Sequence, residues 1–124
     1  TKKAAQEYGL KVLVEGCQNN KDNSTRFIVI SKELIIPKDA DKISLCFSLP
    51  HVTGSLYNVL GRFSSNGMNL TKLESRPRDG RAFEYLFYLD FQGSVHNNPK
   101  VVNLLCALSE EMPEFSFLGN YKEL

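Results

Sequence analysis

Apolar and polar residues alternate regularly from about residue 40 onward. In the segment 43–49 every second residue is large and apolar, which predicts a strand with one buried face that ends before Pro50. Over residues 55–65 the apolar residues recur at spacings of three and four, which predicts an amphipathic helix. Asn66-Gly67 is a typical helix end.

Two further apolar segments, 68–76 and 82–92, flank the sequence Pro77-Arg78-Asp79-Gly80. Proline followed by Asp-Gly favours a tight turn, so the two segments are predicted to form an antiparallel hairpin. Period-two alternation in the second strand predicts one face made of Phe83, Tyr85, Phe87, Leu89 and Phe91, and an opposite face made of Glu84, Leu86, Tyr88 and Asp90.

A second helix is predicted after Asn98 and Pro99, which are typical residues for an N-cap and a first helical position. Pro113 is expected to end it, and a last strand is predicted over residues 114–121. The buried stripe of this helix is expected to contain Val101, Leu104, Leu105, Leu108 and Met112. The resulting order of strand, helix, strand, strand, helix, strand predicts an α+β, ferredoxin-like βαββαβ domain over residues 40–124, with two helices on one face of an antiparallel sheet.

Residues 1–39 follow a different pattern. The end of a helix is predicted over residues 4–8 with Gly9 as its cap, followed by short strands over residues 11–15 and 25–31 on either side of a polar loop. These pieces are too few to bury an apolar core, so we expect residues 1–39 to be the last part of an α/β domain, together with a linker over residues 34–41.

Composition narrows the possible functions only modestly. The 124 residues carry 15 Lys plus Arg against 14 Asp plus Glu, a balance that gives no general attraction to nucleic acid or anionic lipid. Cys17, Cys46 and Cys106 are odd in number and widely spaced, which favours a reducing, cytoplasmic setting without disulfides or zinc. No apolar run approaches the roughly 20 residues of a membrane helix.

Three short segments carry chemistry that is worth testing. Gly54-Ser55-Leu56 opens the first predicted helix, where free N–H groups suit a carboxylate, although a plain glycine turn with a serine cap is the commoner explanation. Glu74-Ser75-Arg76-Pro77 could bind both charged groups of an amino acid, or could be a solvated strand end. Thr25-Arg26-Phe27 offers a proton donor beside an anion-binding guanidinium, but most such tripeptides only begin a strand.

Other polar and aromatic residues are assigned no role. His51 and His96 have no partner at metal-ligand spacing, so no metal or other cofactor is expected. The aromatic row of the second hairpin strand is the expected core beneath the helices. An RNA-binding alternative of the RRM type shares the same element order, but Glu84 stands where its strand motif needs a small residue.

Taken in order, these motifs resemble the prephenate dehydratases with their regulatory ACT domain, including the bifunctional chorismate mutase/prephenate dehydratases. The family pattern Asn-x-Thr-Arg-Phe stands here as residues 23–27, and its Glu-Ser-Arg-Pro motif stands as residues 74–77. The segments 85–91 and 118–121 are similar to the later ACT strands, so the resemblance covers nearly the whole chain.

The resemblance implies a lyase that converts prephenate to phenylpyruvate, water and carbon dioxide in phenylalanine biosynthesis, with feedback inhibition by phenylalanine. It implies that Thr25 donates a proton to the departing hydroxyl, and that Asn23, Arg26 and Phe27 help to hold the substrate. It also implies an allosteric phenylalanine site at a homodimer interface, formed by Gly54, Ser55, Leu56, Asn69, Leu70, Glu74, Ser75, Arg76 and Pro77. Helix N–H groups would bind the carboxylate there, and Glu74 or nearby carbonyls the ammonium.

Two departures from the family qualify these expectations. The usual Pro-Gly-Ala-Leu turn reads Thr53-Gly54-Ser55-Leu56 here, which is expected to loosen the turn and alter the pocket. The earlier lobes of a dehydratase are absent from these residues, so the chain alone is expected to be inactive. The remaining alternative is an amino-acid-binding ACT module of another aromatic amino acid enzyme, which would leave Thr25-Arg26-Phe27 unexplained.

Overall fold

The computed structural model describes residues 1–19, 24–78, 84–112 and 114–124. It divides into two units, residues 1–30 and residues 31–124, and each is described by itself. The predictions for Asn23, Asp79, Gly80, residues 82–83 and Pro113 concern positions that lie outside the described residues.

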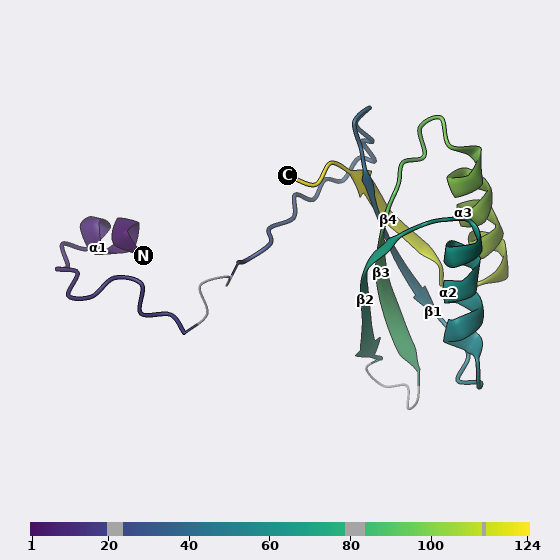
Figure 1. The fold of residues 1–124 in the computed structure, drawn as a ribbon, viewed down its shortest axis with the longest axis horizontal. Coiled ribbons are helices and arrows are strands. Elements are labelled where there is room, and N and C mark those ends of the chain that lie inside the picture. The colour runs from purple at the N-terminus through teal and green to yellow at the C-terminus, as the bar shows by residue number, and fades with distance from the viewer. Residues whose placement is uncertain (20–23, 79–83, 113) are drawn as a thin grey trace. The chain divides into compact units, whose positions relative to one another are not determined.

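The second unit contains one antiparallel sheet with two helices on one of its faces (Figure 1). Its strands lie in the order β2-β3-β1-β4. The elements are β1 (Lys42–Ser48), α2 (Ser55–Ser65), β2 (Leu70–Pro77), β3 (Tyr85–Gln92), α3 (Pro99–Glu111) and β4 (Ser116–Tyr121). This arrangement confirms the predicted ferredoxin-like fold, which is the ACT-type fold.

Local chemistry explains where α3 begins and where α2 ends. The α3 helix starts at Pro99 because the side chain of Asn98 accepts a hydrogen bond from the Val101 N–H at 3.4 Å. The α2 helix ends at Asn66 and Gly67, where the Gly67 backbone turns to a φ of 71°. Both boundaries confirm the sequence prediction.

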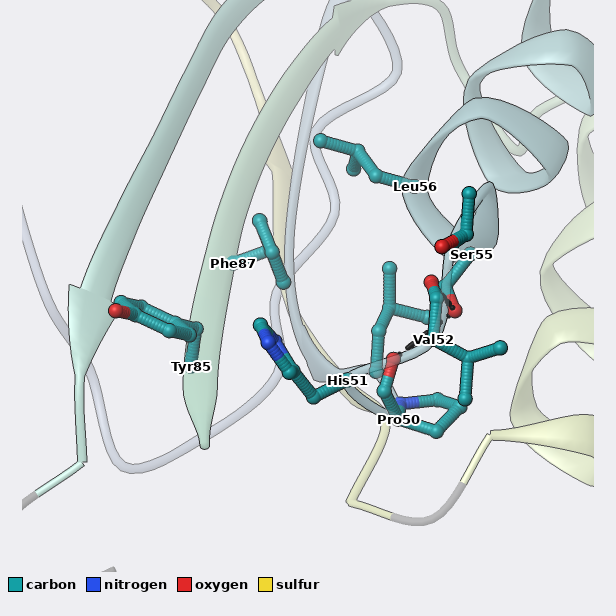
Figure 2. Close-up of a pocket in the computed structure, with 9 residues that line it drawn as sticks. Pro50, His51, Val52, Ser55, Leu56, Tyr85 and Phe87 are labelled. Atoms are coloured by element: carbon teal, nitrogen blue, oxygen red, sulfur yellow. Dashed lines mark hydrogen bonds between the residues drawn. The ribbon is translucent and has the colours of Figure 1, made fainter. Parts of the chain in front are cut away.

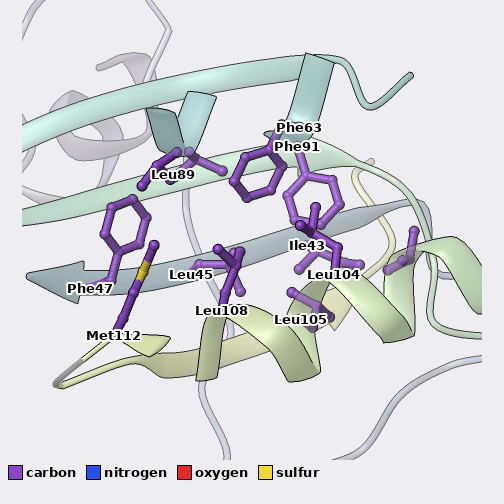
Figure 3. Close-up of a cluster of buried hydrophobic side chains, with 12 residues drawn as sticks. Ile43, Leu45, Phe47, Phe63, Leu89, Phe91, Leu104, Leu105, Leu108 and Met112 are labelled. Atoms are coloured by element: carbon purple, nitrogen blue, oxygen red, sulfur yellow. The ribbon is translucent and has the colours of Figure 1, made fainter. Parts of the chain in front are cut away.

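The core lies between the helices and the central strand β1 (Figure 3). Ile43, Leu45 and Phe47 on β1 are completely buried, and each contributes on the order of 1.5–3 kcal/mol through burial. Phe63 of α2 meets Phe91 of β3 edge to face, with ring centroids 5.2 Å apart. The predicted stripe of α3 is buried in full, comprising Val101, Leu104, Leu105, Leu108 and Met112.

The two faces of β3 differ in character. Phe87, Leu89 and Phe91 belong to the core beneath the helices, whereas Tyr88 and Asp90 lie on the face that no helix covers. We call this second face the open face. Phe87 and Phe91 therefore lie in the core as predicted, whereas the prediction is wrong for Tyr85, which is 39% exposed because it stands at the end of β3 beyond the cover of the helices.

Asn120 of β4 is a buried polar residue whose role the sequence did not predict. Its amide nitrogen donates to the Lys42 carbonyl at 2.9 Å and the Gly93 carbonyl at 3.2 Å. Its amide oxygen accepts from the Val95 N–H at 2.9 Å and the Ser94 hydroxyl at 3.3 Å. One side chain therefore joins β4, the start of β1 and the connection between β3 and α3.

Ion pairs join the start of β1 to the segment that follows β4. Lys122 forms an ion pair with Asp41, whose other carboxylate oxygen accepts a 2.9 Å hydrogen bond from the Glu123 N–H. The buried amine of Lys42 pairs with Glu123. Residues 31–39, predicted to be mostly linker, belong to this unit, and the Ile36 carbonyl lies 3.3 Å from the His96 imidazole.

The first unit has less regular structure than the sequence predicted. Helix α1 (Lys2–Glu7) is capped by Thr1, and Gly9 has a φ of 63°. The strands predicted over residues 11–15 and 25–31 are wrong, because the described residues there form no strand. A strand requires a neighbour for its backbone hydrogen bonds, and Leu13 and Val29 are exposed at 85% and 100% within the described residues.

We expect the Asp41→Asn variant to lower the melting temperature at neutral pH. The hydrogen bonds from Lys122 and from the Glu123 N–H lower the pKa of Asp41, so its carboxylate stabilises the folded state above the unfolded pKa. That contribution disappears as the pH falls through the folded pKa. The melting temperatures of the variant and the wild type should therefore converge between about pH 4 and about pH 2.

Thermal denaturation followed by circular dichroism across this pH range measures the effect, with Asp39→Asn as a control of equal charge change. A constant difference between Asp41→Asn and the wild type down to the lowest pH would contradict the prediction.

Candidate functional site

A compact loop, residues 49–54, connects the end of β1 to the start of α2. The Val52 N–H donates to the Pro50 carbonyl at 2.8 Å, and the Ser55 N–H donates to the Val52 carbonyl at 3.1 Å. The Ser55 hydroxyl lies 2.9 Å from the Pro50 carbonyl and 2.8 Å from the Val52 carbonyl. Ser55 therefore fastens the loop with its side chain, which is a different role from the helix cap considered in the sequence analysis.

Gly54 occupies the N-cap position of α2 in a left-handed conformation, with a φ of 85°. No side chain caps this helix end. The first N–H groups of a helix have no partner within the helix, so those of Leu56 and Tyr57 are positioned to bind an anion. Anion binding at this helix end stays a prediction.

A pocket of about 310 Å³ lies beside this loop (Figure 2). The loop forms one wall, and β3 contributes the opposite wall through Tyr85 and Phe87. The lining residues are Leu49, Pro50, His51, Val52, Thr53, Ser55, Leu56, Tyr85 and Phe87. Ser55 and Leu56 were predicted as site residues, and Gly54 lies directly beside the lining residues. Thr53, at the family's proline position, also lines the pocket.

Seven of the nine lining residues were not among the predicted site residues, and His51, Tyr85 and Phe87 are three of these seven. His51 was assigned no role, and Tyr85 and Phe87 were assigned to the core. Phe87 serves both purposes, because its ring stacks on Phe47 with centroids 5.9 Å apart. Alternation along β3 predicts on which face of the sheet each side chain lies. It does not predict that this end of the strand lies beside the loop after β1.

The Glu-Ser-Arg-Pro motif at the end of β2 is divided between the two faces of the sheet. Ser75 and Pro77 pair with Phe87 and Tyr85, so they share the face of the pocket wall. Glu74 and Arg76 pair with Tyr88 and Leu86 and therefore lie on the open face. The structure thus places Ser75 and Pro77 beside the pocket wall, and Glu74 and Arg76 away from it.

Glu74 is engaged by two cations of its own strand. Its carboxylate lies 3.1 Å from the Lys72 amine and 2.5 Å from the Arg76 guanidinium. Hydrogen bonds from Lys72 and Arg76 lower the pKa of Glu74, so it is ionised at neutral pH. Within one chain, Glu74 therefore does not face a ligand bound in the pocket.

Asn69 and Leu70 lie at the opposite end of β2 from Pro77. The Asn69 side-chain amide donates to the Gln92 side chain at 3.0 Å, and Leu70 pairs with Phe91. Leu70 and Pro77 are seven positions apart, which corresponds to roughly 23 Å along a strand. A single chain does not bring Asn69 and Leu70 to the pocket.

The candidate catalytic residues Thr25, Arg26 and Phe27 belong to the first unit. All three are exposed there, and the Phe27 side chain is 87% exposed. Among the residues that the structure describes, no group of three His, Cys, Asp or Glu side chains could hold a metal ion. No described helix is long and apolar enough to cross a membrane.

Comparison with known proteins relates almost the whole chain to one family. The prephenate dehydratase family model matches residues 1–34. A bifunctional chorismate mutase/prephenate dehydratase of Aquifex aeolicus is 38% identical over 95% of this chain. The chain is homologous to the prephenate dehydratases. A prephenate dehydratase of Methanocaldococcus jannaschii is 37% identical over 98% of the chain.

The homology extends to solved structures. A prephenate dehydratase of Arthrobacter aurescens in complex with L-Phe has a TM-score of 0.63 and is 32% identical, covering 75% of this chain and 30% of that one. Our chain spans 32% of the length of the Aquifex protein and 44% of the Methanocaldococcus protein. The resemblance inferred from the sequence motifs is thereby confirmed.

We expect alanine substitutions at two glycines of the α2 region to have opposite effects on stability. Gly54→Ala should destabilise the fold by about 1–2 kcal/mol, because a side chain disfavours the left-handed backbone. Gly61→Ala should stabilise it by about 0.5–1 kcal/mol, because Gly61 lies within the helix and its added methyl meets nothing within 4 Å.

Urea denaturation of the two variants and the wild type measures both free energies of unfolding. Because the chemical change is identical, each variant is the control for the other. Equal effects of the same sign would show that the conformation at Gly54 is not the cause.

Proposed function

We propose that residues 40–124 form a regulatory domain that binds L-phenylalanine, and that residues 1–39 comprise the end of the catalytic domain of a cytoplasmic prephenate dehydratase together with a linker. The observation that carries this proposal is the pocket between the residue 49–54 loop and β3, in a chain homologous to prephenate dehydratases. A related enzyme has been solved with L-Phe, which supports the choice of ligand.

The pocket offers suitable partners for two parts of phenylalanine. The N–H groups of Leu56 and Tyr57 would bind the carboxylate at the start of α2. Apolar side chains from both walls, among them Leu49 and Phe87, would contact the phenyl ring. A volume of about 310 Å³ suits a ligand of amino-acid size.

The ammonium group of the ligand needs an acceptor that one chain does not provide through Glu74. That carboxylate is paired with Lys72 and Arg76 on the open face. Backbone carbonyls of the loop are one source of acceptors, and the side-chain oxygen of Asn69 of the partner subunit is another. The second source requires a dimer.

The edge strand β2 is suited to pairing with a second copy of itself. It is an outer strand of the sheet, and Leu73 is 42% exposed on the helix-covered face. If two copies pair antiparallel around Leu73, Lys72 lies opposite Glu74 of the partner subunit and the two opposite charges attract each other. Two-fold symmetry repeats this ion pair on the other side of Leu73. Pairing centred on Glu74 would instead place the two Glu74 carboxylates together and Lys72 opposite Arg76 of the partner subunit.

Pairing centred on Leu73 would also complete the proposed site. Antiparallel strands bring the beginning of one β2 next to the end of the other. Asn69 and Leu70 of the partner subunit would then lie beside Pro77, one strand away from Tyr85 of the pocket wall. The residues that one chain keeps apart would meet across the dimer interface.

The catalytic part of the proposal concerns residues 23–27. In the complete enzyme Thr25 would donate a proton to the hydroxyl that leaves prephenate, and Arg26 would bind a substrate carboxylate in a forked geometry. Asn23 and Phe27 would complete this part of the substrate site. Since the chain spans only 32–44% of its relatives, we propose that these 124 residues alone do not catalyse the reaction.

We expect L-phenylalanine to bind the chain saturably in isothermal titration calorimetry, with D-phenylalanine and L-tyrosine as comparison ligands. Gly54→Val should abolish binding, because it distorts the start of α2, whereas Gly61→Ala should retain it. Circular dichroism must show that each variant is folded. Absence of binding by the folded wild-type dimer would refute the regulatory function.

The β2 pairing predicts a specific cross-link. In a background with Cys17 and Cys106 replaced by serine, Leu73→Cys should form a disulfide-linked dimer on oxidation, because facing residues of paired strands lie about 4.5–5.5 Å apart. Ser75→Cys, on the same face of the same strand, is the matched control. Cross-linking of Ser75→Cys alone would show that the strands pair in a different register.

A further inference from the structure

A second hollow of about 290 Å³ borders the same loop, between α2 and the end of α3. Three parts of the fold meet around it, namely the end of β1, one flank of α2 and the last residues of α3. Leu49, Pro50 and Ser55 line both this hollow and the pocket described above. We call it the interhelix hollow. Its volume is close to that of the first pocket and suits a ligand of similar size.

The inner wall of the interhelix hollow is apolar and belongs to the core. Val59 and Met112 are buried members of the core cluster, and Leu49 packs against that cluster. Such residues hold their positions because the whole core packs around them. No aromatic side chain occurs among the described lining residues, whereas the first pocket contains Tyr85 and Phe87. The wall therefore suits an aliphatic group.

The outer rim of the hollow carries one charge of each sign. Arg62 of α2 forms a two-pronged ion pair with Glu111 at the end of α3, in which Nη1 donates to Oε2 and Nη2 donates to Oε1 at 3.2 Å. These two are the charged side chains among the described lining residues. Asn58 lies one turn before Arg62, on the same flank of α2. Pro113, which follows Met112, lies outside the described residues and has no charged group.

The ion pair leaves binding capacity on both of its partners. A guanidinium has further N–H groups besides the two that contact Glu111, and each carboxylate oxygen accepts more than one hydrogen bond. Both side chains are partly exposed, so a ligand can reach them from solvent. A ligand with a carboxylate next to an ammonium group would bind Arg62 and Glu111 together without separating them. An amine or a carboxylate alone would engage only one of the two.

We propose that the interhelix hollow binds an α-amino acid with an aliphatic side chain. Its carboxylate binds Arg62, and its ammonium group binds Glu111. Its side chain packs against Val59 and Met112. The amide of Asn58 is a further donor to the carboxylate. This site is separate from the proposed phenylalanine pocket and does not depend on it. Because the two sites share the loop after β1, an amino acid bound here contacts one wall of that pocket.

Calorimetric titration with L-leucine and with two of its analogues tests the proposal. Isoamylamine lacks the carboxylate of leucine, and isocaproate lacks the ammonium group. We expect saturable binding of L-leucine, and binding of each analogue about three- to tenfold weaker, since each analogue loses one charge-assisted contact at an exposed rim. Absence of L-leucine binding by the folded protein, or equal binding of all three compounds, would overturn the proposal.

Two variants identify the residues that bind the charged groups. Arg62→Met should weaken L-leucine binding by about three- to tenfold and remove the preference over isoamylamine, because the variant and the analogue lose the same contact. Glu111→Gln should in the same way remove the preference over isocaproate. Full preferences in both variants would show that this ion pair does not bind the ligand.

Two further variants serve as controls. Arg78→Met removes another ion-paired arginine, one that does not line the hollow, and should leave L-leucine binding unchanged. Tyr85→Ala alters a wall of the first pocket only and should also leave it unchanged. Circular dichroism must show that each variant is folded. Loss of binding in Tyr85→Ala without a change in Arg62→Met would place L-leucine in the first pocket and overturn the proposal.

Discussion

The fold depends on the completely buried row of Ile43, Leu45 and Phe47 along β1. This strand lies between β3 and β4, and the helices pack over it, so most of the apolar core meets at its covered face. The end of this strand also fixes the position of the candidate site, because the loop at residues 49–54 begins there. The stacking of Phe87 on Phe47 connects the pocket wall to the same row. Core and pocket are therefore built from one continuous set of contacts.

Hydrogen bonds within the loop after β1, and between this loop and Ser55, hold the loop in its conformation. Ser55 binds two loop carbonyls, and Gly54 adopts the left-handed conformation that the turn requires. Because Ser55 turns back toward the loop, its side chain does not cover the first N–H groups of α2. The serine that replaces the family's alanine thus stabilises the turn without occupying the anion position, and Thr53 becomes part of the pocket lining.

The distribution of charge over β2 explains why one chain provides only part of the proposed site. Strand alternation places Glu74 and Arg76 on the open face, where Lys72 completes a row of paired charges. The same row gives the edge strand complementary charges for a second copy and discourages pairing in the Glu74-centred register. Asn69 lies at the far end of the strand, so in the proposed site it would have to come from a neighbouring chain.

The sequence alone determined the element order of residues 40–124, the end of α2, the start of α3, the covered face of β3 and the family resemblance, because each follows from local periodicity, capping chemistry or a contiguous motif. It wrongly predicted strands over residues 11–15 and 25–31, because a strand requires a hydrogen-bonding partner that an apolar pattern does not supply. Only the tertiary structure decided that His51, Tyr85 and Phe87 line one pocket. It also decided that Glu74 faces away and that Asn120 joins three segments. These depend on strand register and on which strand ends meet, and both are set by long-range packing around β1.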